Sequence, residues 1–237
     1  MKIILTRPEE DAAALAEAVI RMGGEPVISP TLKIQYRDEK VALLPDEALA
    51  FTSANGVRAY CRLSPERNRL VYVVGSATAA TARQNGFALI KTADGDAKSL
   101  AALIALSKRS NSIVHFAGEK RAVDLSEALA GTGVKSRAVV VYAAVPTMAL
   151  SVDAAAALRS NPEKTAVTFF SPRSAALFLQ QAGEAGLDGQ LGQSHALCLS
   201  EAVAAAAGDN WRDKQVTTGK SSVAMTDLLK KLIQMTE

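Results

Sequence analysis

Small polar residues follow six apolar runs of this 237-residue sequence, each where a strand is expected to pass into a helix. At the carboxyl ends of parallel strands, helix N-termini present unpaired N–H groups and the positive ends of their dipoles, and such places bind anions. Helix capping explains any single corner, but six corners that face one cleft favour a site for an anionic ligand. The corners are Thr6-Arg7-Pro8, Ser53-Ala54-Asn55-Gly56, Gly75-Ser76-Ala77-Thr78, Gly118-Glu119-Lys120-Arg121, Ser171-Pro172-Arg173 and Ser200-Glu201.

Tyr142 is the candidate for a proton donor. It ends a Val-Val-Val run at the point where the chain is expected to cross between two lobes. An unperturbed phenol has a pKa of about 10 and stays protonated at neutral pH, so it could serve as a neutral acid. A half-buried hinge residue with a solvated hydroxyl is the structural alternative. His115, His195, Cys61 and Cys198 are expected to be buried structural residues.

The composition excludes several classes of protein. With 49% hydrophobic and 22% charged residues, the chain is neither disordered nor fibrous. The net charge of +3 is spread along the chain and aromatic residues make up 5%, so nucleic acid is not an expected partner. Two cysteines outside any CxxC pair exclude a disulfide framework or structural zinc, and no metal is expected. No apolar run approaches the roughly 18 residues of a membrane span, so a cytoplasmic protein without membrane contact is expected.

Three familiar motifs are present only in part. Gly219-Lys220-Ser221 is similar to the end of a phosphate loop, but Lys214 stands where the first glycine belongs. Gly131-x-Gly133 follows a helix, the reverse of a dinucleotide motif. The run from Gly192 to Ala196 lacks the last glycine of a hydrolase nucleophile turn. The sequence therefore does not point to ATP, NAD or a serine nucleophile, and no cofactor is expected.

Short apolar runs alternate with amphipathic stretches from end to end, which is typical of parallel strands covered by helices. Ten such strands exceed a single ordinary doubly wound sheet. The last helix is expected to bury one face that includes Met225, Leu229 and Ile233. Strands are expected at Lys2–Leu5, Glu25–Ile28, Ala48–Thr52, Val71–Val74, Ala88–Lys91, Ser112–Phe116, Arg137–Ala143, Ala166–Phe170, Ala196–Leu199 and Gln215–Thr218.

Three stretches of the sequence occur twice in related form. FTSANGVRA from Phe51 matches FFSPRSAAL from Phe169, VVGSATAATA matches CLSEAVAAAA, and the segment from Ile4 matches the segment from His115. The matched units occur in a different order in the two copies, which is explained if one lobe is inserted into the other. We therefore expect an outer lobe of residues 1–36 and 147–237 and an inserted lobe of residues 37–146. Two crossing segments, 31–37 and 142–148, would form a two-strand hinge beside a cleft.

An ordered series of short motifs runs through the whole sequence. The motifs are ILTRP, ISPTLKI, FTSANGV, VYVVGSATA followed by Gly86-Phe87, FAGEKR, VVVYAAVP and TFFSPRSA. In this combination the chain resembles the bacterial uroporphyrinogen-III synthases over essentially its full length. One corner departs from the family, because Leu199-Ser200-Glu201-Ala202-Val203-Ala204 stands where members often carry Ile-Gly-x-Thr-Thr-Ala. That departure removes the threonines that would support a binding role at Ser200.

The resemblance implies an α/β protein of two similar doubly wound, flavodoxin-like lobes, with substrate between them and no cofactor. The implied substrate is hydroxymethylbilane, a linear tetrapyrrole with eight carboxylate side chains. Its terminal hydroxyl leaves as water to give an azafulvenium cation, and the substituted carbon of the last pyrrole ring attacks to form a spiro intermediate. Fragmentation and recombination invert that ring before closure to uroporphyrinogen III. Without the enzyme the ring closes uninverted.

Carried over to this chain, the resemblance assigns the departing hydroxyl to Tyr142 and the substrate carboxylates to a set of donors. Because the enzyme must hold a flexible polyanion in one shape, donors matter more than a nucleophile. The deaminase that forms the bilane is the implied transient partner, and a monomer is expected. Two alternatives stay open, a two-lobed small-anion binding or sensor protein without catalysis, and an enzyme that uses a nucleotide at Gly219-Lys220-Ser221. The donors are Thr6, Arg7, Ser53, Asn55, Gly75, Thr78, Gly118, Ser171 and Ser200.

Overall fold

The computed structural model describes residues 1–38, 41–107, 109, 111–120, 124–219 and 221–235. Within those ranges, no helix is long and apolar enough to cross a membrane. The strands are β1 (Lys2–Leu5), β2 (Glu25–Ile28), β3 (Leu32–Tyr36), β4 (Glu47–Phe51), β5 (Val71–Val74), β6 (Ile90–Ala93), β7 (Ser112–Gly118), β8 (Lys135–Pro146), β9 (Thr165–Phe169), β10 (His195–Cys198) and β11 (Asp213–Val216). The helices are α1 (Glu9–Arg21), α2 (Ala54–Leu63), α3 (Gly75–Gln84), α4 (Ala97–Ser107), α5 (Leu125–Ala128), α6 (Val152–Ser160), α7 (Pro172–Glu184), α8 (Asp188–Leu191), α9 (Glu201–Ala206) and α10 (Ser222–Gln234), with a short 3-10 helix η1 (Pro162–Lys164).

The chain forms two compact units. Unit 1 comprises residues 1–33 and 145–237, and unit 2 comprises residues 34–144. The boundaries expected from the sequence were 36/37 and 146/147, so the chain leaves unit 1 three residues earlier and re-enters it two residues earlier than expected. Both passages fall inside strands, β3 and β8, rather than in loops.

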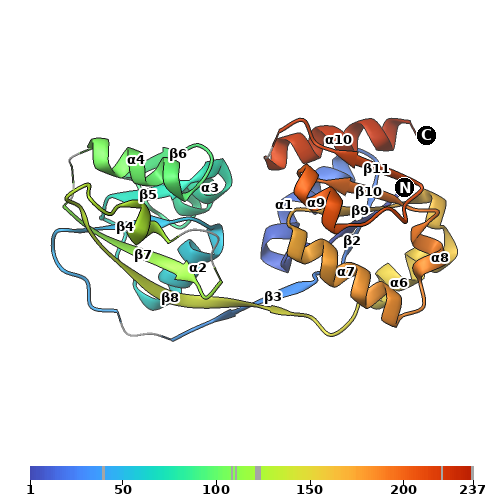
Figure 1. Ribbon diagram of the computed structural model, residues 1–237, viewed down its shortest axis with the longest axis horizontal. Helices are drawn as coiled ribbons and strands as arrows, with labels where there is room; N and C mark the ends of the chain where they lie inside the picture. The colour runs from blue at the N-terminus through green and yellow to red at the C-terminus, as the bar shows by residue number, and fades with distance from the viewer. Residues whose placement is uncertain (39–40, 108, 110, 121–123, 220, 236–237) are drawn as a thin grey trace. The chain divides into compact units, whose positions relative to one another are not determined.

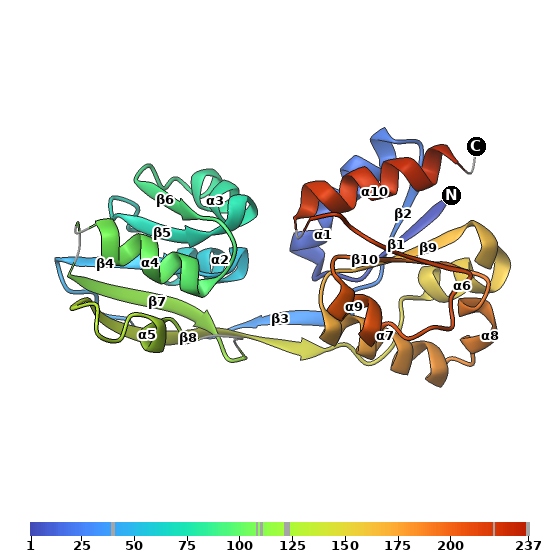
Figure 2. The same cartoon turned by 45° about the horizontal axis from the view of Figure 1, so that its top comes forward.

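Unit 1 is built on a five-stranded parallel sheet in the order β11-β10-β9-β1-β2. Successive side chains of a strand point to opposite faces, so Ile4 packs with α6, α7, α8 and α9, whereas Ile3 and Leu5 pack with α1 and α10. Figures 1 and 2 show these two groups of helices on either side of the unit 1 sheet. Because both faces are covered, the strands appear in the sequence as continuous apolar runs.

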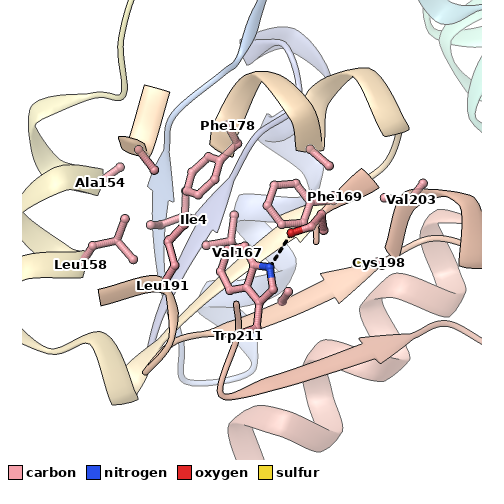
Figure 3. Packing of buried hydrophobic residues seen from close by; sticks show 14 of the residues in the cluster. Ile4, Ala154, Leu158, Val167, Phe169, Phe178, Leu191, Cys198, Val203 and Trp211 are labelled. Carbon is pink, nitrogen blue, oxygen red and sulfur yellow. Dashed lines mark hydrogen bonds between the residues drawn. The ribbon is translucent and has the colours of Figure 1, made fainter. Parts of the chain in front are cut away.

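Aromatic side chains fill the centre of one face of unit 1. The Phe169 ring stands edge-on to Phe178 and Trp211, with ring centroids 5.4 and 5.7 Å apart (Figure 3). The Trp211 indole N–H donates to the carbonyl oxygen of Ala207 at 2.8 Å, so its one polar atom has a partner inside the protein (Figure 3). Trp211 therefore closes the edge of this core.

Unit 2 contains a six-stranded sheet in the order β3-β8-β7-β4-β5-β6. The pairs from β8 to β6 are parallel. Helices α2 and α3 cover one face, where Phe51, Tyr60 and Phe116 pack together. Helices α4 and α5 cover the other face, against Ala50 and Ile113. Unit 2 is therefore also a three-layer α/β structure.

The two sheets share one strand order. In unit 1, β1, β2, β9, β10 and β11 are the first to fifth strands, and their spatial order is 2-1-3-4-5, the order of flavodoxin-like sheets. Unit 2 has the same spatial order when β7, β8, β4, β5 and β6 are taken as its first to fifth strands. After the edge strand β3, the chain therefore builds the third strand of this order, β4, before the first, β7. The repeated segments of the sequence correspond to these equivalent strands. The predicted fold class, two α/β units with mostly parallel sheets, is confirmed.

Strands β3 and β8 are antiparallel neighbours where the chain passes between the units. In unit 2, the Arg37 amide donates to the Val141 carbonyl at 2.9 Å, and in unit 1 the Thr147 amide donates to the Thr31 carbonyl at 3.0 Å. The residue number rises along one strand as it falls along the other. The segments 31–37 and 142–148 were the pair expected to cross together, and these bonds hold them side by side.

Six of the ten expected strands begin at other residues than expected. Strand β6 begins two residues later, and β4, β8, β9, β10 and β11 begin one or two residues earlier. Strand β6 starts at Ile90, because Phe87 packs against Phe51 and Tyr60 and residues 87–89 carry the chain from α3 to the sheet edge. Strand β11 starts at Asp213, opposite His195, and ends before Thr217, whose hydroxyl donates to the Gly219 carbonyl at 2.7 Å. In both cases a local packing or turn contact overrides the apolar pattern.

A buried carboxylate fixes the amino end of the unit 2 sheet. The Glu47 carboxylate accepts from Nε and Nη2 of Arg137, both at 2.8 Å, and from the Leu44 amide at 2.8 Å. The hydrogen bonds and charge of Arg137 hold the pKa of Glu47 below its usual 4.5, although burial opposes that shift. The Glu47 side chain is 2% exposed, so loss of its charge is not compensated by water.

Replacing this carboxylate is expected to destabilise unit 2. Glu47→Gln should lower the unfolding free energy by about 2 kcal/mol at neutral pH, because charge-assisted hydrogen bonds are lost. Because the folded-state pKa is lowered, this stabilisation is fully present above the usual value of 4.5 and is lost as pH falls through the folded-state pKa. The difference in stability between the original chain and the variant should therefore shrink progressively below pH 4.5. Hydrogen exchange of the β4 and β8 amides measures the unfolding free energy of the original chain and of the variant. Glu66→Gln is the control, because Glu66 is 40% exposed in its ion pair with Arg69, and this variant should change the unfolding free energy little. Equal effects of the two variants would contradict the prediction.

Candidate functional site

Each sheet has one point where neighbouring strands lead to helices on opposite faces. In unit 1, β1 leads to α1 on one face and β9 leads to α7 on the other. In unit 2, β7 leads to α5 and β4 leads to α2 in the same way. In doubly wound sheets the carboxyl ends of such strand pairs are where ligands bind. We call these places the unit 1 edge and the unit 2 edge.

Arg7 supplies a cation at the unit 1 edge. Its guanidinium carbon lies 4.7 Å from the centroid of the Phe170 ring. One terminal nitrogen lies 3.4 Å from the Asp11 carboxylate, and the other donates to the Ser222 hydroxyl at 3.5 Å. The ring supports one face of the planar cation, which keeps N–H groups available for a two-pronged contact with a carboxylate. The side chain is 26% exposed, so an anion from solvent can reach it.

Thr6 has a different place from the one expected. It is fully buried, and its hydroxyl donates to the Thr168 carbonyl at 2.6 Å. Its own carbonyl accepts from the Thr31 amide at 3.2 Å. The residue therefore ties β1 to β9 and to the segment after β2. Its hydroxyl is not placed to meet a carboxylate, which corrects the expectation for this position.

The serines at the other corners of unit 1 cap helices. The Ser171 hydroxyl accepts from the Ser174 amide at 3.1 Å and donates to the Ser174 hydroxyl at 3.0 Å. The Ser200 hydroxyl accepts from the Val203 amide at 3.4 Å. Ser221 caps α10 by accepting from the Ala224 amide at 3.2 Å, which gives part of the Gly219-Lys220-Ser221 motif a structural role; Lys220 lies outside the described residues. These contacts orient the first turns of α7, α9 and α10.

Ser53 and Asn55 begin α2 at the unit 2 edge. The Ser53 hydroxyl accepts from the Asn55 amide at 3.1 Å, and the Asn55 side-chain oxygen accepts from Arg58 at 2.7 Å. Asn55 is 6% exposed, so it positions Arg58 more than it faces solvent. Gly56 follows because a Cβ there would lie 2.6 Å from the Phe116 carbonyl oxygen. The missing side chain lets the first turn of α2 approach β7 closely.

Tyr142 lies against Gly118 at the same edge. The two residues are paired in register across β8 and β7, beside an irregularity in the ladder. A Cβ on Gly118 would lie 2.8 to 2.9 Å from atoms of the Tyr142 ring, so only glycine leaves room for it. The Glu119 amide donates to the Tyr142 carbonyl at 2.9 Å, and the Glu119 carboxylate accepts from Arg37 at 2.5 Å. Backbone and side-chain contacts thus fix the chain on both sides of the ring.

Helix α3 begins at the next strand of unit 2 without a side-chain cap from the described residues. Its first residue, Gly75, has φ of +78°, a conformation that favours glycine, and no atom lies within 4 Å of where a Cβ would be. Because no described side chain caps this turn, its first backbone N–H groups are candidates to bind an anion. Thr78, in the same turn, is 5% exposed, so its hydroxyl is less accessible than this backbone.

The thiols are unsuited to nucleophilic chemistry. Cys198 is fully buried in β10, and burial raises the pKa of its thiol to about 11. Burial also raises the pKa of Cys61 in α2. A thiol with a raised pKa is mostly protonated at neutral pH and reacts slowly. In the described part of the chain, no three His, Cys, Asp or Glu side chains are grouped to hold a metal ion.

The structure brings the predicted residues together in two groups. Arg7, Ser171 and Ser200 follow β1, β9 and β10, which are neighbours in the unit 1 sheet. Ser53, Asn55, Gly75, Thr78 and Gly118 follow or end β4, β5 and β7, and Tyr142 lies opposite Gly118. Sequence reasoning missed Phe170, Arg58 and Arg37, which contact the predicted residues. Phe170 could have been found from the sequence because it is the second residue of a Phe-Phe pair at a strand end. It directly precedes the Ser171 corner, and the strand beside it leads to Arg7.

A comparison with protein-family models gives the chain a family. Residues 13–224 match the model of Uroporphyrinogen-III synthase HemD. The chain belongs to the uroporphyrinogen-III synthase family. The family predicted from the ordered motifs is therefore confirmed. The matched residues include every strand except β1 and the whole of the unit 2 edge, whereas β1 and Arg7 precede them.

Individual relatives of the uroporphyrinogen-III synthase family agree in fold. The crystal structure of uroporphyrinogen-III synthetase from Helicobacter pylori 26695 superposes with a TM-score of 0.67 at 17% identity, covering 98% of this chain and 99% of that one. A mutant uroporphyrinogen III synthase from the extremely thermophilic bacterium Thermus thermophilus superposes with a TM-score of 0.52 at 15% identity over the full length of both chains. A Methanocaldococcus jannaschii protein named "Putative uroporphyrinogen-III synthase" is 38% identical over 88 residues, which are 34% of this chain and 37% of that protein. The chain thus spans about a third of that curated relative in the match, whereas the structural superpositions cover 98% or more of both chains.

Proposed function

We propose that this chain converts hydroxymethylbilane to uroporphyrinogen III, as a cofactor-independent cyclising hydro-lyase of tetrapyrrole synthesis. The observation that carries the proposal is the family match over residues 13–224. In the reaction, a proton converts the terminal hydroxyl to water, which leaves as the neighbouring pyrrole stabilises the cation. Attack by the substituted carbon of the last ring gives the spiro intermediate. After fragmentation and recombination invert that ring, closure and loss of a ring proton restore the aromatic pyrrole.

The residues at both edges suit the recognition of a polyanion. Arg7 provides a planar cation backed by Phe170 at the unit 1 edge. At the unit 2 edge, Arg58 lies one turn into α2. Next to that edge, at the end of β5, the first turn of α3 offers backbone N–H groups without a side-chain cap among the described residues. Charge-assisted hydrogen bonds of this kind contribute about 1.5–3 kcal/mol each, so four or five suffice for a polycarboxylate ligand. The mild net charge of +3 is compatible with this because the donors are local.

The proposed chemistry needs position more than reactive groups. The leaving hydroxyl is activated by the electron-rich pyrrole, so the enzyme's main task is to hold the substrate in the shape that leads to the spiro route. Buried thiols with raised pKa values at Cys198 and Cys61 fit a reaction without a covalent enzyme intermediate. Tyr142 is the proposed acid or orienting group at the departing hydroxyl, because its ring is held against Gly118 at the carboxyl end of β7. A monomer in the cytoplasm, with transient contact to the bilane-forming deaminase, remains the prediction of the sequence.

Isomer analysis tests the proposed function. The full chain should convert freshly prepared hydroxymethylbilane mainly to the type III isomer, separated as porphyrins after oxidation. Uncatalysed closure gives type I, so the ratio of the two isomers reports enzyme activity directly. Type I alone, with measurable binding of the bilane, would support the two-lobed binding or sensor protein instead.

Arg7 is expected to contribute to substrate affinity. Arg7→Gln should raise KM for hydroxymethylbilane by about 10-fold or more, because one charge-assisted contact to a carboxylate is lost. Steady-state kinetics with both isomers quantified provides the measurement. The control is Arg21→Gln, since the Arg21 side chain is 69% exposed and pairs only at 3.8 Å with Glu17. An unchanged KM in the Arg7 variant would remove Arg7 from the proposed site.

Tyr142 is expected to affect turnover rather than isomer choice. Tyr142→Phe should reduce kcat by about 10-fold or more, because general-acid assistance to the departing hydroxyl is lost, while the product stays type III. Gly118→Ala should act similarly, since its Cβ would displace the ring. Tyr36→Phe, on β3 of the same unit, is the control. Loss of all type III product in Tyr142→Phe, as in a deletion, would contradict the view that shape controls the reaction.

A further inference from the structure

A buried histidine in unit 2 has a contact that the proposed chemistry leaves unexplained. His115 lies in β7, next to β4, and is 1% exposed. Its Nε2 lies 3.1 Å from the hydroxyl oxygen of Thr52, which follows β4 directly and precedes the Ser53 cap of α2. The contact therefore reaches from inside the sheet to the unit 2 edge.

The register of the two strands aims this imidazole at the edge. His115 is paired with Ala50 across β7 and β4, and Thr52 stands two residues beyond Ala50, so its side chain lies on the same face. Ile113, two residues earlier on β7, shows that this face is the one covered by α4 and α5. On that face, the imidazole lies between the buried residues of β7 and the Thr52 hydroxyl, which is just past the end of β4.

Apolar packing alone does not explain a histidine here. Its neighbours on this face of the two strands, Ala48, Ala50 and Ile113, are apolar and buried. A polar ring in such surroundings costs free energy unless it makes hydrogen bonds, whereas the Thr52 hydroxyl, being partly exposed, could be solvated without it. What the ring adds is a fixed direction for the hydroxyl. An aliphatic side chain at position 115 would fill the space but leave that hydroxyl free to rotate.

We infer that His115 is a positioning residue whose Nε2–H donates to Thr52, so that the Thr52 hydroxyl hydrogen is directed to a carboxylate bound at the unit 2 edge. A hydroxyl has one hydrogen, and with an oxygen lone pair taken up by the imidazole N–H that hydrogen is available to an anion. In the opposite arrangement the hydroxyl donates to Nε2 and offers an anion only lone pairs. Recognition of a carboxylate therefore requires the first arrangement. The inference rests on the proposed function, since it takes the ligand at this edge to be the polycarboxylate substrate.

The protonation of Nε2 can be measured without any substrate. The chain has two histidines, so the full-length protein labelled with ¹⁵N-histidine gives two imidazole patterns in a long-range ¹H–¹⁵N correlation spectrum. A His195→Gln variant assigns them. The expected result is a protonated Nε2 in His115 at neutral pH. An unprotonated Nε2 would show that Thr52 donates to the ring, and that result overturns the inference whether or not the chain makes uroporphyrinogen III.

Kinetics then test whether the pair acts on the substrate. His115→Leu and Thr52→Val should each raise KM for hydroxymethylbilane about 10-fold with kcat within twofold, because binding is lost and not the chemical step. The double variant should be no worse than either single one, since both changes remove the same donor. His115→Gln and Thr52→Ser, which keep an N–H and a hydroxyl, should stay within threefold of the original KM. Melting temperatures identify variants that fail to fold. If His115→Leu or Thr52→Val does not fold, the conservative variants His115→Gln and Thr52→Ser still allow the test.

The outcomes separate this inference from the proposed function. If the unsubstituted chain gives no type III isomer, the proposed function fails and the protonation experiment still decides the direction of the hydrogen bond. If type III forms but His115→Leu, correctly folded, keeps the original KM, the positioning role is wrong and the proposed function stands. Independent, multiplying effects of the His115 and Thr52 variants would equally overturn the inference.

Discussion

Parallel strands covered by helices on both faces admit polar side chains only where these find hydrogen-bond partners, and this constraint decides where chemistry can occur in the molecule. Ile3, Ile4 and Leu5 in β1 are fully buried, and the cations, amides and hydroxyls gather past the strand ends. At the strand ends, the helix N-termini already present backbone N–H donors, and the side-chain donors add to them. The polar residues that do lie inside a sheet confirm the rule, because Thr6 and Thr168 each donate to a carbonyl of the neighbouring strand.

The same sheet is built twice with the chain threaded differently. In unit 1 the first strand in the order 2-1-3-4-5 is also the first in the chain, whereas unit 2 begins with the third. Strands β3 and β8 of unit 2 are hydrogen-bonded neighbours. The chain therefore leaves unit 1 and returns to it through two segments that lie side by side. Insertions whose ends lie close together disturb their host little. The shared order explains why corresponding corners carry donors in both units.

Much of this arrangement could be predicted from sequence, because apolar runs and helix caps are local signals. The strand runs, the inserted unit and the capping serines Ser53, Ser171 and Ser200 follow from patterns of neighbouring residues. Contacts made across the sheet were not predictable in this way. Thr6 turns inward to Thr168, 162 positions away, and Phe170 meets Arg7 only because β9 lies beside β1. The expectation for Thr6 failed because its hydroxyl had two possible partners and only the fold decides between them.

The pairing of β1 with β9 has a consequence for how the protein is made. A ribosome adds residues from the N-terminus, so all of unit 2 has been synthesised before β9, β10 and β11 exist. Until then β1 and β2 are a two-stranded fragment, too small to be stable alone, with the inner edge of β1 unpaired. The inserted unit is contiguous and can fold first, whereas its host must wait for its central strand. During translation the nascent chain therefore carries an open, apolar strand edge for the time needed to add more than a hundred residues, which is when it most needs protection from aggregation.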